Sequence, residues 1–149
     1  MCCQVDRIVV DTNVLVSAAL SGGGVARAVL RRCLRREVVP LIGQALFTEY
    51  EDVFARDAPF ARSPLSREDR EALLDAFLAV CRWTQVSFLW RPNLRDEADN
   101  HLVELAVAGA ASAIVTGNVR DLATGELRLG RLRVLSPAAY LASHPAEEP

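Results

Sequence analysis

Two short apolar runs in this 149-residue chain are each followed directly by polar residues whose side chains can bind cations or phosphate groups. The runs cover residues 8–10 and 113–115 and are rich in β-branched residues, which is typical of buried strands in a parallel sheet. Parallel sheets place their functional sites at the carboxyl ends of the strands, so both positions are candidates for one site. The polar residues are Asp11, Thr12 and Asn13 after the first run, and Thr116, Asn118 and Asp121 after the second.

Three further acids lie on or beside predicted helices. Glu49 falls at the edge of the apolar face of a helix predicted over residues 44–56. A half-buried carboxylate costs free energy unless a cation or a hydrogen-bond donor meets it. Asp96 and Asp99 flank the start of a helix predicted over residues 99–110, and Asp99 is in line with the inward face of that helix.

Each of these acids also has an ordinary structural explanation. Asp11 can cap the helix that follows its strand, and Asp96 and Asp99 suit the positive end of a helix dipole. Glu49 can reach solvent at the rim of its helix, and Asp121 can simply be solvated. Together, four or more acids at the ends of neighbouring elements are what a hard divalent cation requires. The chemistry that follows is metal-assisted phosphodiester hydrolysis, because a bound metal activates water and neutralises phosphate charge.

The elements that must position these residues alternate between strand and helix along the chain. This alternation predicts an α/β fold, a three-layer α/β/α sandwich with a mostly parallel central sheet. Ser66 is predicted to cap one of the helices, with Asp69 three residues on. The predicted strands cover residues 8–10, 38–42, 84–89, 113–115 and 132–135, and the predicted helices cover residues 14–20, 25–36, 44–56, 66–82, 99–110 and 137–142.

Length and composition indicate one domain over residues 1–149, with an ordered core over about 7–142 and a disordered tail over 143–149. Hydrophobic residues make up 51% and charged residues 24%, which excludes wholesale disorder. No apolar run approaches the roughly 18 residues of a membrane span, so we expect no membrane association. The cysteines lack metal-ligand spacing, so Cys33 and Cys81 are expected to be buried free thiols in a reducing cytoplasm.

All 17 basic residues are arginines, and the net charge is −2. This balance gives no overall attraction for nucleic acid, so a polyanionic partner must be held by a local arginine patch or by bound metal. The helix predicted over residues 25–36 has such a patch on one face, which could track an RNA backbone or could simply be solvated. The patch consists of Arg27, Arg31, Arg32, Arg35 and Arg36.

Several enzyme classes are excluded by missing motifs. The chain has no G-x-x-x-x-G-K-[ST] sequence for a nucleotide phosphate cradle and no G-x-S-x-G sequence for a serine hydrolase. Asp11 lacks the second Asp, two residues on, of a haloacid-dehalogenase-like phosphatase.

From about Arg7 to Leu141, the sequence resembles the PIN-domain family of small metal-dependent ribonucleases, which includes many toxins of bacterial toxin–antitoxin pairs. The segment IVVDTNVLVSA at residues 8–18 is similar to the family's opening strand with its first catalytic Asp. EYEDVFAR at 49–56 and RDEADNHL at 95–102 resemble the segments with the second and third acids. IVTGNVRDL at 114–122 is similar to the family's strand and turn, although Asn118 stands where many members have Asp.

The resemblance implies an endoribonuclease that uses Mg²⁺ or Mn²⁺, with RNA as substrate, a cognate antitoxin as partner, and a homodimeric state. Loss of turnover, leaving a module that binds RNA or protein, is the alternative that Asn118 supports. The implied catalytic residues are Asp11, Glu49, Asp99 and Asp121. The implied metal ligands are Asp11, Glu49, Asp96, Asp99, Asn118 and Asp121, and the residues implied to position phosphate or metal-bound water are Thr12, Asn13 and Thr116.

Overall fold

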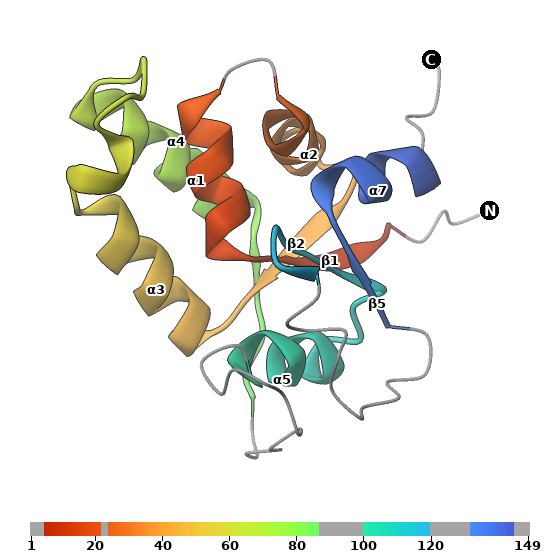
Figure 1. Cartoon of the computed structure of the whole chain (residues 1–149). Helices are drawn as coiled ribbons and strands as arrows, with labels where there is room; N and C mark the ends of the chain where they lie inside the picture. Colours follow the sequence, from red (N-terminus) through yellow and green to blue (C-terminus); the bar gives the residue numbers. More distant parts are fainter. Residues whose placement is uncertain (1–4, 22–23, 87–99, 120–131, 145–149) are drawn as a thin grey trace.

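Five parallel strands form one sheet in the order β3-β2-β1-β4-β5 in the computed structural model (Figure 1). The structure describes residues 5–21, 24–86, 100–119 and 132–144. The chain runs from the central β1 outward to β2 and β3 and then returns to β4 on the other side of β1, so the strand order reverses at β1 and creates a switch point at its carboxyl end. The strands are β1 (Arg7–Val10), β2 (Val39–Ile42), β3 (Arg82–Trp83), β4 (Ala113–Val115) and β5 (Arg133–Leu135).

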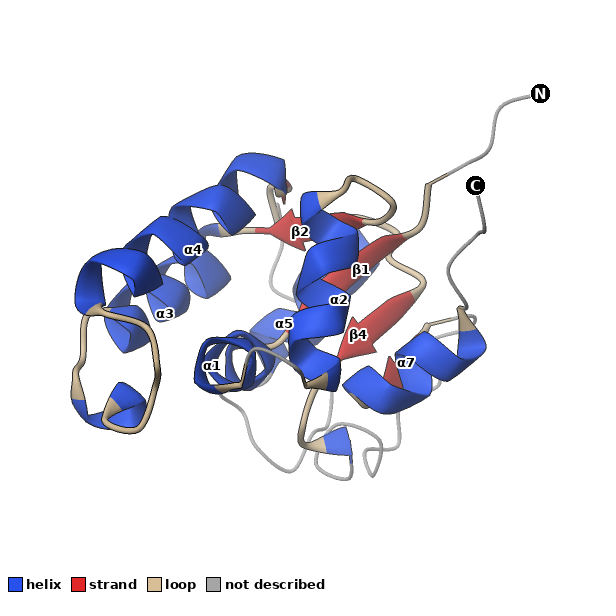
Figure 2. Cartoon of the chain, turned by 90° about the horizontal axis from the view of Figure 1, so that it is seen from above, coloured by secondary structure: helices blue, strands red, loops and turns tan. Residues whose placement is uncertain are grey.

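Helices cover both faces of this sheet, which confirms the predicted three-layer α/β/α architecture. One face is covered by α5, which packs on β1, β2 and β4, and the other by α2 together with α1 and α7 (Figures 1 and 2). The helices are α1 (Thr12–Leu20), α2 (Val25–Leu34), α3 (Gln44–Phe54), α4 (Arg67–Val80), α5 (Asn100–Ala108) and α7 (Pro137–Ser143), with the short 3-10 helix η1 at Ala58–Phe60.

The central strand is buried on both faces. Ile8, Val9 and Val10 have at most 1% of their surface exposed, and they pair in register with the three residues of β4. Apolar residues on consecutive positions are what a strand covered by helices on both sides requires. This explains why the run at residues 8–10 could be identified as a strand without any alternation of polar and apolar residues.

A buried tyrosine fastens α3 to the end of β1. The Tyr50 hydroxyl donates a hydrogen bond to the Val10 carbonyl oxygen, and the Tyr50 ring packs edge-on against Phe77 of α4, with centroids 5.9 Å apart. Tyr50 is fully buried, so this bond forms away from water, where an unpaired polar group would be costly. Since Glu49 precedes Tyr50 and Asp11 follows Val10, the contact brings the two acids to the same place.

The third strand differs from its prediction. The apolar residues at 84–89 predicted a strand there, but β3 consists of Arg82 and Trp83. The end of β2 determines which residues pair, because its last residues Leu41 and Ile42 lie opposite Arg82 and Trp83. The Thr84 amide donates the last hydrogen bond of this pairing to the Ile42 carbonyl oxygen at 2.7 Å. Residues 87–89 lie outside the described residues.

Several helix ends also differ by about two residues from the prediction. Helix α2 ends at Leu34 because Arg36 takes a left-handed conformation (φ 63°), and the Glu37 amide bonds back to the Arg32 carbonyl at 3.0 Å. The predicted Ser66 cap of α4 is confirmed, since its hydroxyl accepts from the Asp69 amide at 3.1 Å. The remaining differences are that α1 begins at residue 12 rather than 14, α3 ends at 54 rather than 56, α4 covers 67–80 rather than 66–82, and α5 ends at 108 rather than 110. The predicted start of α5 at residue 99 lies outside the described residues.

Cysteines and the chain end agree with the predictions only in part. Cys33 is a buried free thiol whose pKa is raised to about 12 by burial, but Cys81 is half-buried and follows α4. Ser143, predicted as part of a disordered tail, completes α7, and the His144 ring stacks on Tyr140 with centroids 4.4 Å apart. Residues 145–149 lie outside the described residues.

Within the described segments, no single helix is long and apolar enough to cross a membrane. Helices α1 and α2 reach the required length and composition only as a pair, with a bend of 107° between them.

We expect Tyr50→Phe to lower the free energy of unfolding by about 1–2 kcal/mol, because the Val10 carbonyl loses a buried hydrogen-bond donor. Urea denaturation followed by circular dichroism would measure this change. Tyr140→Phe is the matched control, since the Tyr140 hydroxyl forms no hydrogen bond to the described residues and its loss should have a smaller effect. Equal stability of Tyr50→Phe and the wild type would contradict the anchoring role of Tyr50.

Candidate functional site

Asp11 carries a carboxylate that is almost completely buried at the carboxyl end of β1, with 7% of the residue exposed. It occupies the N-cap position of α1, but its side chain forms no capping hydrogen bond. Instead, Oδ2 accepts hydrogen bonds from Thr116 Oγ1 at 2.7 Å and from Asn13 Nδ2 at 3.2 Å. The capping explanation therefore does not account for this side chain, which is oriented toward the end of β4.

The turn after β4 holds the Asp11 carboxylate in place. Thr116 is fully buried, and its hydroxyl also accepts a hydrogen bond from the Asn118 amide at 3.0 Å. The Gly117 amide donates to Asn13 Oδ1 at 3.0 Å, which joins this turn to the start of α1. Asn13 and Thr116, predicted to position phosphate or water, thus contact the acid itself, while Asn118 is exposed beside them.

Glu49 lies half-buried on α3, at the edge of its apolar face as predicted. Its Oε2 atom is 2.9 Å from His101 Nε2 of α5. This hydrogen bond lowers the pKa of the Glu49 carboxyl and outweighs the partial burial that raises it. For Asp11, burial raises the pKa, and the charge of Glu49 raises it as well. The charge of Glu49 therefore acts on Asp11, which places the two acids in one electrostatic site.

His101 is a site residue that the sequence analysis did not identify. The sequence suggested no ligand role because its spacing to the cysteines is wrong for a metal site. The signal that could have found it is its place in the first turn of α5, four residues before the buried Leu105 and thus on the same helix face. That face turns toward Glu49, and the structure brings the two side chains together.

The residues at this site fit a divalent cation that prefers oxygen ligands. Two carboxylates share it, and the Thr12 hydroxyl is buried without a hydrogen bond of good geometry to any described residue. A hard cation such as Mg²⁺ binds such oxygens. The described segments contain no group of three or more His, Cys, Asp or Glu residues that could hold a metal ion. Of the other predicted ligands, Asn118 is exposed beside the site, and Asp96, Asp99 and Asp121 lie outside the described residues.

Comparison with known proteins places this arrangement in a family. The sequence profile of the PIN domain matches residues 7–120. The chain belongs to the PIN-domain family. This match confirms the predicted resemblance, and members of the family are generally nucleases. The matched span includes Asp11 and Glu49 but ends one residue before Asp121.

A solved structure has a similar fold. The crystal structure of VapBC2 from Rickettsia felis bound to a DNA fragment from their promoter contains a chain that is similar with a TM-score of 0.56. The sequence identity is 15%, over 87% of this chain and 98% of that chain, so the similarity establishes the fold alone. The sequence matches no curated protein.

In EDTA at neutral pH, Asp11→Asn is expected to raise the thermal unfolding temperature. The amide still accepts the Thr116 hydrogen bond but carries no buried charge. Because burial raises the pKa of Asp11, its ionised form destabilises the fold once the pH exceeds that raised pKa. The advantage of the variant should therefore disappear as the pH falls below the ordinary carboxyl pKa, near about 4, where both states bind the proton.

Differential scanning calorimetry across this pH range would measure the effect. Asp75→Asn, at an exposed position of α4, is the control and should show no such pH-dependent gain. A destabilised Asp11→Asn protein at neutral pH would show that the carboxylate is compensated by its neighbours.

Proposed function

We propose that this PIN-domain protein is a metal-dependent endoribonuclease that hydrolyses RNA phosphodiester bonds and acts as the toxin of a toxin–antitoxin pair. One observation supports this most strongly. The Asp11 carboxylate is buried beside Glu49 at the switch point of a parallel sheet, where an uncompensated charge is costly and a cation would offset it.

In this proposal, Asp11 and Glu49 hold Mg²⁺ or Mn²⁺ together with Asp99, and Asp96, Asn118 and Asp121 complete the site. When bound, the cation would lower the pKa of an attacking water and neutralise charge on the phosphate. Asp11, Glu49, Asp99 and Asp121 are the catalytic residues.

Neighbouring residues prepare the two described acids. Thr116 and Asn13 fix the orientation of the Asp11 carboxylate through their hydrogen bonds to Oδ2. His101 holds the Glu49 carboxylate and keeps it ionised. The Thr12 hydroxyl remains available to donate to a phosphate oxygen or to water. The acids are thus oriented by residues from β4, α1 and α5.

The arginine face of α2 contributes less to RNA binding in this proposal. Arg27 donates to the Ala18 carbonyl oxygen at 2.8 Å, and Arg32 donates to the carbonyl oxygen of His144. These two guanidinium groups fasten α2 to α1 and to the end of α7. The phosphate at the cleaved bond would therefore be held at the acidic site, through bound metal.

The expected partners are a cognate antitoxin and a second copy of the chain, in the cytoplasm. The fold similarity to a chain of the VapBC2 structure supports the antitoxin partner. An antitoxin segment that covers the acidic site would block access of RNA to Asp11 and Glu49.

A second candidate is a PIN module that has lost turnover and acts by binding RNA or protein. Asn118 favours it, because an amide oxygen supplies a ligand without the charge of the Asp found in many members. The two functions can be distinguished by the effect of divalent metal. A nuclease cleaves RNA when the metal is added, whereas a binding module is only stabilised by it.

With a mixed-sequence single-stranded RNA, we expect cleavage in Mg²⁺ or Mn²⁺ and none in EDTA. Asp11→Asn and Glu49→Gln should each lower the rate by on the order of 100-fold or more, because each removes a charged ligand. Gel analysis of the RNA fragments measures this. Glu51→Gln is the matched control, since Glu51 lies on the same helix with its side chain exposed, and its rate should equal that of the wild type.

Cleavage that persists in EDTA, or in Asp11→Asn at the wild-type rate, would contradict the proposed function. Mn²⁺-induced stabilisation of a folded protein that cleaves no RNA would favour the binding module instead.

A further inference from the structure

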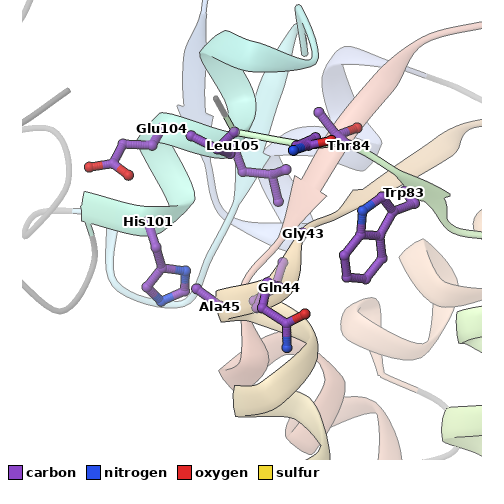
Figure 3. A pocket seen from close by; sticks show the side chains of 11 residues that line it. Gly43, Gln44, Ala45, Trp83, Thr84, His101, Glu104 and Leu105 are labelled. Carbon is purple, nitrogen blue, oxygen red and sulfur yellow. The ribbon is translucent and has the colours of Figure 1, made fainter. Parts of the chain in front are cut away.

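A cavity of about 480 Å³ lies beside the acid pair and takes no part in the proposed mechanism (Figure 3). Three segments line it: the first turn of α3 with Gly43, the end of β3 with the residues after it, and α5. His101 belongs to both places, because it lines the cavity and also bonds to Glu49. The cavity therefore adjoins the candidate active site through His101.

Trp83 gives the cavity an exposed aromatic surface. It is the last residue of β3, at the edge of the sheet, and 55% of its surface is exposed. Phe47 of α3 packs against the Trp83 ring edge-on, with centroids 6.2 Å apart and planes at 68°. This contact holds the indole while leaving much of it open, and an exposed, held aromatic ring is a platform on which nucleobases stack.

Apart from Glu104, the rest of the lining combines apolar and uncharged polar groups. Leu46 and Leu105 are buried apolar members, while Gln44 and Gln85 are exposed. Figure 3 shows the Trp83 and His101 rings on opposite sides of the cavity, with the Gln44 side chain between them. A nucleobase has an apolar face and a hydrogen-bonding edge, so it matches this combination of ring, apolar floor and amide groups.

Charge favours a base over a phosphate or an acidic peptide in this cavity. Glu104 is its acidic lining residue, and no arginine is among the described residues that line it. A phosphate would thus meet no arginine there, and the imidazole of His101 is already paired with Glu49, whereas an uncharged base would meet no repulsion from Glu104. The phosphate of a bound strand would instead lie toward the proposed metal site.

The spacing of the strands connects the two places. Strands β3 and β1 are separated by β2 alone, so their carboxyl ends lie about 10 Å apart at the usual strand spacing. Trp83 and Asp11 thus both lie at the carboxyl ends of their β-strands, close enough for one short single-stranded RNA to reach both. In a duplex, the face of a base is stacked on its neighbours and its hydrogen-bonding edge is paired. A base that stacks on Trp83 must therefore come from an unpaired RNA strand.

We propose that this cavity is a nucleobase subsite for single-stranded RNA, in which a base next to the cleaved bond stacks on Trp83. The inference rests on the proposed ribonuclease function and names the form of RNA that the enzyme takes.

A short single-stranded RNA that contains 2-aminopurine tests the subsite, because stacking quenches the fluorescence of that base. Titration in EDTA keeps the RNA intact. For the wild type we expect quenching on binding; Trp83→Ala should lose the quenching and bind about tenfold more weakly, and Trp83→Phe should retain part of both. Val107→Ala, at an exposed position of α5 outside the cavity, should bind as the wild type does. Thermal unfolding verifies that each variant is folded.

Wild-type affinity and quenching in Trp83→Ala would overturn the subsite, as would a wild type that binds no single-stranded RNA. Unchanged RNA binding in Trp83→Ala, together with loss of a protein partner, would assign the cavity to that partner and also overturn it. Cleavage assays in Mn²⁺ separate this inference from the function on which it rests. Quenched binding without cleavage supports the subsite and contradicts the nuclease, whereas cleavage by Trp83→Ala with unchanged KM supports the nuclease and contradicts the subsite.

Discussion

The buried carboxylate of Asp11 is the constraint on which the rest of this site depends. A negative charge at the end of a fully buried strand is tolerated only where donors or a cation meet it. The Thr116 hydroxyl and the Asn13 amide meet it directly, and they come from the two elements that follow β4 and β1. At the same strand end, the Tyr50 hydroxyl donates a hydrogen bond to the Val10 carbonyl oxygen. This contact brings α3, and with it Glu49, next to Asp11. The position of the second acid thus follows from packing that also stabilises the fold.

Much of the fold could be predicted because its central strands are short runs of consecutive apolar residues. The apolar runs of β1 and β4 require burial on both faces, and that requirement alone predicts a parallel sheet between helices. Asp11 and Thr116 could be placed together for the same reason, since the carboxyl ends of neighbouring parallel strands share one edge. The Ser66 cap is likewise local, because its donor lies three residues away.

The parts that could not be predicted depend on partners distant in sequence. Strand β3 has only two residues, and their pairing is decided by where β2 ends rather than by the apolar residues that follow. His101 meets Glu49 only because α5 and α3 approach the same edge of the sheet, and the two residues are far apart in the chain. Trp83 becomes an exposed platform because its strand lies at the edge and Phe47 supports its ring. Such features follow from tertiary packing, which no local pattern specifies.

The most direct test of the central claim is a crystal structure of the protein soaked in Mn²⁺, with anomalous scattering used to locate the ion. We expect a peak bound by carboxylate oxygens of both Asp11 and Glu49, at coordination distances of about 2 Å. Crystals of Asp11→Asn, soaked in the same way, should lose that peak. A well-ordered site without anomalous density, or a peak that contacts neither carboxylate, would contradict the assignment of this acid pair as the metal centre of the protein.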